Sequence, residues 1–157
     1  MPSLHLTTFI AAPVGRVFDL SRNLAVCKYV FNSRKETFSS GVGANLLSNG
    51  ETVTITAKHA WKKRSSMLRL TVLQKPFLFV EEQVKGDLQN FRHEHHFKEV
   101  NNGAIMIDLV EFGLPRDIIG KLLAKMYLRK YLEELILKRH EAIKLYAETE
   151  RWRAVLS

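Results

Sequence analysis

Two histidines spaced one residue apart, His93 and His95, are the side chains of this 157-residue chain best placed to do chemistry. Side chains alternate between the two faces of a strand, so both imidazoles would share a face with Phe91 and Phe97. The charged residues that alternate with these four along the strand would face solvent. Imidazole groups on an apolar face can hydrogen-bond a ligand, transfer a proton or bind a metal ion.

A hairpin predicted at Asn102-Gly103 would bring a carboxylate to the same face. With a two-residue loop at this dipeptide, residues 97, 95 and 93 would lie opposite residues 108, 110 and 112. Asp108, Val110 and Phe112 would then join the two histidines on the inner face of the sheet.

A second turn, at residues 87–88, would place Glu82 opposite His93. The register of this hairpin is less constrained, because a slip of one residue would turn Glu81 and its odd-numbered neighbours inward instead. In the first register Glu82 could pair with His93, and buried polar groups require such partners.

Strands must position these residues, and the hydrophobic pattern predicts a meander from residue 51 onward. Residues 51–61 alternate strictly, which is typical of a half-buried antiparallel strand. Further strands are predicted at 66–74, 77–85, 90–99 and 104–113. The inner face of strand 51–61 carries Val53, Ile55, His59 and Trp61, and that of strand 66–74 carries Leu68, Leu70 and Val72.

The flanking segments complete an α+β pattern. A strand is predicted at 3–10, two short helices follow at about 13–20 and 24–30, and another strand follows at 36–40. Residues 116–148 are helical, but the apolar phase slips near Met126–Leu128, which predicts a kink or two helices. We therefore expect one helix-grip domain over residues 1–157, a curved antiparallel sheet of about seven strands wrapped around a long C-terminal helix. The space between them would be a ligand cavity.

Composition limits the function classes. The single cysteine, Cys27, excludes an internal disulfide framework and a multi-cysteine zinc site. No apolar run is long enough to span a bilayer, and the N-terminal residues lack a signal-peptide pattern, so a cytoplasmic protein is expected. The net charge of +8 lies wholly in residues 1–80, which hold 11 Lys and Arg against 3 Asp and Glu. Such a field attracts anionic surfaces, although a solvated basic loop explains it equally simply.

The order and spacing of several segments resemble the Bet v 1-like, START-related superfamily of polyketide cyclases, lipid-binding proteins and coenzyme Q-binding proteins. The segments that carry the resemblance are residues 9–13, 17–20, 50–54, 79–86, 91–97 and 108–112, and the likeness covers nearly the whole chain. It implies the helix-grip fold and binding of a hydrophobic compound. Members bind very different ligands, so the ligand itself is not implied.

We expect the cavity to bind a hydrophobic small molecule such as a lipid, a quinone or a polyketide-like compound. The expected lining residues are Val53, Ile55, His59, Trp61, Leu68, Leu70, Val72, Glu82, Phe91, His93, His95, Asp108, Val110, Phe112 and Met126. The polar members could satisfy one another, orient a ligand, or form an acid–base or metal site. No metalloprotease helix, nucleophile elbow or phosphate-binding glycine motif is present, and we expect no metal and no cofactor.

Two other functions stay open. The resemblance to cyclases is compatible with a polyketide cyclase or dehydrase-like enzyme that uses the cavity histidines and Asp108. The basic first half of the chain, densest at Lys62, Lys63 and Arg64, could instead contact a membrane or a ribosome. An oligomer is also possible.

Overall fold

The computed structural model describes residues 3–41, 45–59, 62–115 and 120–156 of the chain. The strands are β1 (Ser3–Ile10), β2 (Thr37–Ser40), β3 (Thr52–His59), β4 (Lys62–Gln74), β5 (Leu78–Lys85), β6 (Phe91–Val100) and β7 (Gly103–Phe112). The helices are α1 (Val14–Ser21), α2 (Leu24–Ser33), α3 (Lys121–Glu148) and α4 (Trp152–Leu156).

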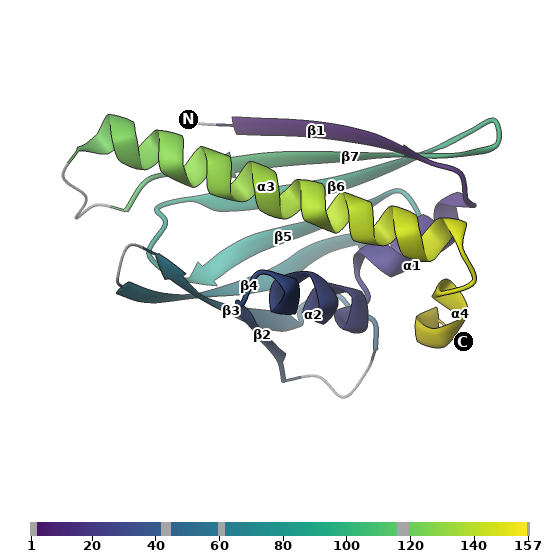
Figure 1. Cartoon of the computed structure of the whole chain (residues 1–157), viewed down its shortest axis with the longest axis horizontal. Helices are drawn as coiled ribbons and strands as arrows, with labels where there is room; N and C mark the ends of the chain where they lie inside the picture. The colour runs from purple at the N-terminus through teal and green to yellow at the C-terminus, as the bar shows by residue number, and fades with distance from the viewer. Residues whose placement is uncertain (1–2, 42–44, 60–61, 116–119, 157) are drawn as a thin grey trace.

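The strands form one antiparallel sheet in the order β1-β7-β6-β5-β4-β3-β2. The sheet curls around α3, which runs across its concave side, while α1 and α2 lie beneath the helix (Figure 1). This arrangement confirms the expected α+β helix-grip architecture with seven strands. No helix in the described part of the chain is long and apolar enough to cross a membrane.

The local sequence explains where the short elements begin. Asn23 caps α2, because its side-chain oxygen accepts hydrogen bonds from the backbone N–H groups of Ala25 and Val26. Strand β3 alternates as predicted, with Val53 and Ala57 buried and the intervening threonines half-exposed.

Tight aromatic packing fills one end of the space between the sheet and the helices. Phe18 of α1 meets Phe79 and Phe97 of the sheet edge-on, with ring centroids 5.7 and 5.2 Å apart. Ile10 and Leu70, which are fully buried, belong to the same cluster. Because this end is closed by packed side chains, a cavity can form only toward the other end of the fold.

Helix α3 is continuous over 28 residues, so the predicted kink near Met126–Leu128 is wrong. The apolar stripe changes phase because the helix has two different environments along its length. Leu122, Leu123 and Met126 are 72%, 75% and 61% exposed, whereas Leu132 and Ile136 are buried against the sheet. One continuous helix is therefore compatible with both apolar stripes, because the stripe of Leu122, Leu123 and Met126 does not enter the core.

Strand register differs from the prediction in two hairpins. The β6–β7 loop is centred on Asn101-Asn102, with Asn102 at a φ of 66°, so His95 lies opposite Asp108. This pairing is offset by two residues from the predicted one, and the inward faces stay as predicted because the side-chain period is two. In the β5–β6 hairpin the slip of one residue does occur, and Glu81 lies opposite His93.

A bulge in β4 turns one predicted lining residue outward. The β4–β5 register shifts between Leu70 and Val72, so that Val72 pairs with Val80 and Leu73 pairs with Phe79. One extra residue inverts the alternation of side chains beyond it. Leu73 consequently packs against the core, where the sequence pattern predicted Val72.

Candidate ligand-binding cavity

A cavity of about 560 Å³ lies between α2, α3 and the concave side of the sheet. Its wall is mostly apolar. Phe31 of α2 stacks on Phe38 of β2, with ring centroids 5.3 Å apart, and both rings line it. The volume is within the range of pockets that hold drug-sized molecules.

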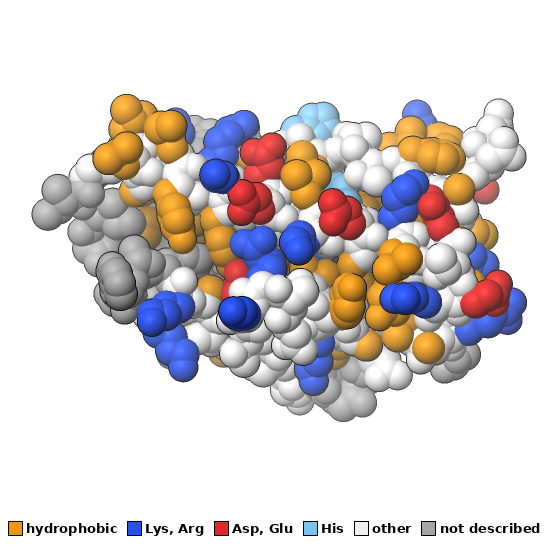
Figure 2. All heavy atoms as spheres, viewed as in Figure 1, with side chains coloured by type: hydrophobic (Ala, Val, Ile, Leu, Met, Phe, Trp, Pro, Cys, Tyr) orange, Lys and Arg blue, Asp and Glu red, His pale blue; other side chains and the backbone are white. Residues whose placement is uncertain are grey.

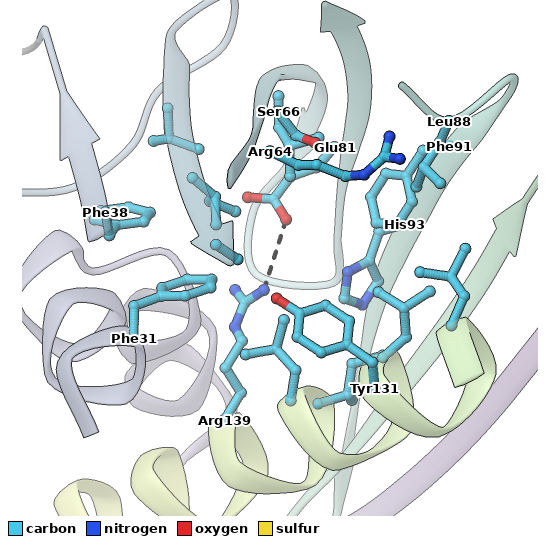
Figure 3. Close-up of a pocket in the computed structure, with 18 of the residues that line it drawn as sticks. Phe31, Phe38, Arg64, Ser66, Glu81, Leu88, Phe91, His93, Tyr131 and Arg139 are labelled. Atoms are coloured by element: carbon cyan, nitrogen blue, oxygen red, sulfur yellow. Dashed lines mark ion pairs between the residues drawn. The ribbon is translucent and has the colours of Figure 1, made fainter. Parts of the chain in front are cut away.

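Three buried polar side chains reach the cavity from different elements. Glu81 comes from β5, His93 from β6 and Arg139 from α3, and Figure 3 shows all three directed toward the same space. Arg139 Nη1 lies 3.6 Å from Glu81 Oε2, and Nη2 donates a hydrogen bond to the backbone oxygen of Ser21 at 2.9 Å. The polar groups therefore form a connected cluster within the apolar wall.

A second layer of polar groups supports this cluster from behind. His95 Nε2 lies 3.1 Å from Glu81 Oε2, and its Nδ1 lies 3.2 Å from Asp108 Oδ1. His140 of α3 approaches the other oxygen of Asp108 at 3.1 Å. Its Nδ1 is hydrogen-bonded to the hydroxyl of Thr8 at 2.7 Å. The cluster thus connects β1, β5, β6, β7 and α3.

The charges within the cluster follow from these contacts. Burial alone would raise the pKa of Glu81, but its contacts with His95 and Arg139 lower that pKa to about 2. Asp108 is buried too, and the neighbouring histidines hold its pKa well below the ordinary value. Burial lowers the pKa of His95, but Asp108 and Glu81 outweigh it, and the pKa is raised overall. The two carboxylates therefore face Arg139 and His95, whose two ring nitrogens each lie against one of them.

His93 differs from its neighbour, because burial and the charge of His95 lower its pKa to about 4. It is therefore a neutral imidazole at pH 7. Its Nε2 lies 3.1 Å from Asp108 Oδ2 and donates a hydrogen bond to that carboxylate. This bond selects the tautomer in which Nδ1 carries a lone pair. A neutral imidazole held by a carboxylate can accept either a hydrogen bond or a proton from a bound molecule.

Three residues of the cluster have side chains that can bind a metal ion. Glu81, His93 and His95 offer ligand atoms that all lie within 4.8 Å of one another. However, both nitrogens of His95 already face carboxylates, and the guanidinium of Arg139 lies beside Glu81. A divalent cation would have to enter next to this fixed positive charge, so the geometry favours an ion-pair network.

The mouth of the cavity lies near the start of α3. Its exposed lining residues, among them Asp87, Leu123 and Tyr127, are at this end. The guanidinium of Arg64 donates a hydrogen bond to Asp87 across the rim. Figure 2 shows hydrophobic side chains gathered over the first turns of the helix, at the upper left of the view.

The structure distributes the predicted lining residues over several places. Five of them line the cavity, namely Val53, Ile55, Leu68, Phe91 and His93. Five others are buried outside the lining, namely Leu70, His95, Asp108, Val110 and Phe112. The side chain of His59 and the whole of Trp61 lie outside the described residues.

Three predicted lining residues point away from the cavity. Val72 is turned to the other face of the sheet by the bulge in β4. Glu82 faces outward because of the one-residue slip in the β5–β6 hairpin, and it pairs with Arg92. Met126 lies on the exposed side of α3.

Sequence reasoning missed Arg139 and His140. Both are buried, and both lie in the apolar stripe of α3, three and four residues after Ile136. Charged or polar residues at such positions face the core together with their apolar neighbours. The position of Arg139 in the apolar stripe could therefore have predicted its burial, and a buried Arg must have an anionic partner on the facing sheet.

Comparisons with known proteins place the fold. No family model and no curated protein matches the sequence. Among solved structures, the protein TTHA0849 from Thermus thermophilus is 18% identical, with a TM-score of 0.76 over 99% of this chain and 100% of that one. The Zhui aromatase/cyclase from a Streptomyces species is 12% identical, with a TM-score of 0.70 over 94% and 93%. A START superfamily protein from Mycobacterium smegmatis is 7% identical, with a TM-score of 0.67 over 93% and 97%. The chain therefore shares the helix-grip fold of these structures, as the resemblance to Bet v 1-like and START proteins predicts.

Proposed function

We propose that the protein reversibly binds a hydrophobic small molecule in the cavity between the sheet and α3. The observation that carries this proposal is a volume of about 560 Å³ with an apolar wall and a charge-balanced polar cluster at one side. Each buried methylene group contributes about 0.8 kcal/mol. A ligand of roughly ten carbons would therefore gain about 8 kcal/mol before the entropic cost of association, which corresponds to affinities weaker than about micromolar.

The similar structures support a small-molecule role. One is named as an aromatase/cyclase and another as a START superfamily protein. We carry this over to the present chain only as the class of ligand, an apolar compound of lipid, quinone or polyketide type. The pocket itself, which is lined by both aromatic and aliphatic side chains, suits such compounds.

Native mass spectrometry of the freshly purified protein, followed by organic extraction, tests this function. We expect a stoichiometric apolar compound, or binding of an added one. Ile55→Trp should fill part of the cavity and reduce the bound fraction. Val84→Trp, at an exposed position outside the lining, is the matched control and should leave the bound fraction unchanged. Equal binding by the two variants would contradict the proposal.

Acid–base catalysis on the bound molecule is the second candidate, and the pairing of His93 with Asp108 favours it. The 3.1 Å contact orients a neutral imidazole at the cavity wall, which is the arrangement of a general base. Once a bound compound is identified, its turnover is measured directly. His93→Ala should abolish turnover while the compound is still retained. Unchanged turnover in this variant would exclude His93 as the base.

A contact between the cavity mouth and an anionic membrane would give an apolar ligand a route in and out. Leu122 and Leu123 are exposed beside Lys121 and Lys125, a combination of apolar and basic side chains that suits a lipid surface. Vesicles that contain phosphatidylserine should sediment the protein. Leu123→Glu should reduce this more than Phe77→Glu, an equally drastic change at a distant exposed site. Equal effects of the two changes would refute the contact.

A further inference from the structure

Nδ1 of His93 is a hydrogen-bond acceptor to which no described residue donates. An ionised carboxylate can only accept, so the 3.1 Å contact between Nε2 and Asp108 Oδ2 requires the proton to be on Nε2. Among the described residues, no hydrogen-bond partner of Nδ1 is found, and the atom is not sealed off from the cavity. Since His93 is only 4% exposed and lines the cavity, its lone pair is available to a molecule that enters that space.

Neighbouring donors are engaged elsewhere. Arg139 donates to the backbone oxygen of Ser21 and faces Glu81, and the hydroxyl of Tyr131 donates to Glu36 at 2.8 Å. Figure 3 shows the rings of His93 and Tyr131 and the Arg139–Glu81 ion pair around the same space. Since none of the described side chains donates to it, Nδ1 of His93 is open to a donor from a bound molecule or from solvent, and a buried acceptor left without a donor is costly.

The charge of the cluster limits what that donor can be. Glu81 and Asp108 are already matched by Arg139 and by His95, whose two nitrogens each face one of the carboxylates, so the cluster has no unmatched charge to offer an ion. A carboxylate or phosphate group entering the same space would be a buried charge without compensation. An ammonium group would meet the same difficulty with the opposite sign.

We propose that the ligand carries a neutral hydroxyl group, an alcohol, phenol or enol, that donates a hydrogen bond to Nδ1 of His93 while the apolar body of the ligand fills the cavity. This inference rests on the proposed function, because it specifies the polar end of the same ligand. It makes the cavity selective for hydroxyl compounds over the corresponding ethers and acids.

Three naphthalene probes of similar size separate these possibilities. 2-Naphthol carries the donor, 2-methoxynaphthalene lacks it, and 2-naphthoate carries a charge. Calorimetric titration of the whole protein at pH 7 should show 2-naphthol binding about fivefold to tenfold more tightly than the ether, with 2-naphthoate the weakest. His93→Phe should bring the ratio of naphthol to ether affinity close to one. Phe91→Leu, which alters the apolar wall, should weaken both probes and keep their ratio.

A measurement on the wild-type protein covers the case in which His93→Phe does not fold. Long-range proton–nitrogen NMR of ¹⁵N-labelled histidine reports the tautomer of His93, which should be protonated at Nε2 and unprotonated at Nδ1. A proton on Nδ1 would overturn the inference. So would equal affinities for naphthol and ether, or tightest binding of naphthoate, although either result would leave the proposed function intact. If none of the probes binds, the cavity does not take apolar compounds and both proposals are refuted.

Discussion

Mild acid should destabilise the folded protein, and His93 should be the cause. Burial, together with the positive charge of His95, lowers the pKa of His93 from 6.5 to about 4 in the folded state. In the unfolded chain the same imidazole takes up a proton near its ordinary pKa. Between these two values the unfolded state binds more protons than the folded state. The free energy of unfolding must therefore decrease as the pH is lowered through this window.

The size of the effect follows from the two pKa values. Linkage gives a loss of about 1.5 kcal/mol between pH 6.5 and pH 5, and of about 3 kcal/mol by pH 4 relative to neutral pH. The neighbouring groups do not obscure it. Glu81 and Asp108, whose pKa values are lowered, contribute stability that is lost only below about pH 4.5 and 3.8. His95, whose pKa is raised, contributes stability that is fully present below pH 6.5 and is lost as the pH rises above it.

Urea unfolding followed by circular dichroism at pH 6.5, 6.0, 5.5 and 5.0 measures this directly. His93→Gln places an amide donor near Asp108 but cannot be protonated, so its stability should change by less than about 0.5 kcal/mol over the window. His96→Gln removes a histidine from the outward face of the same strand and should retain the decline of the wild type. The reasoning is refuted if wild-type stability is flat between pH 6.5 and 5, or if His93→Gln declines as steeply.

Three further predictions concern the stability of the fold. Glu81→Leu or Arg139→Leu alone should destabilise the fold by about 3–5 kcal/mol, because each leaves a buried charge unpaired, and the double variant should lose less than either one in chemical denaturation. Asn23→Ala removes the α2 cap and should cost about 1–2 kcal/mol of unfolding free energy, measured in the same way. Gly103→Ala would place a Cβ 2.4 Å from the backbone oxygen of Ile10. This clash should destabilise the protein by about 1 kcal/mol or more, which would lower its thermal midpoint by several degrees.

Alternation of side chains was enough to predict much of the sheet. The inward faces of β6 and β7, and hence the burial of His93, His95 and Asp108, follow from a period of two and are insensitive to a shift of two residues. The partners across the strands are sensitive to such a shift. Because Asn101 and Asn102 form the turn, rather than Asn102 and Gly103, His95 lies opposite Asp108.

The remaining errors arose where local pattern does not determine the outcome. A bulge after Leu70 turned Val72 outward, and nothing in a single alternating strand reveals an inserted residue. The cluster of Arg139 with Glu81 joins a helix to a strand more than fifty residues away, so it depends on tertiary packing that periodicity cannot describe. The continuity of α3 depends on the open cavity mouth, which allows its first turns to remain exposed.

The strand order has a consequence for how the protein is made. β1 pairs with β7, so residues 3–10 find their partners only at residues 104–111, after all the other strands of the sheet. Contacts of such long sequence separation slow folding, since a large loop must close before they form. On the ribosome the edge of β1 would therefore stay unpaired until β7 had emerged. Only then can α3 settle over the sheet, so the cavity would be among the last features to form, and an incomplete chain would have no binding site.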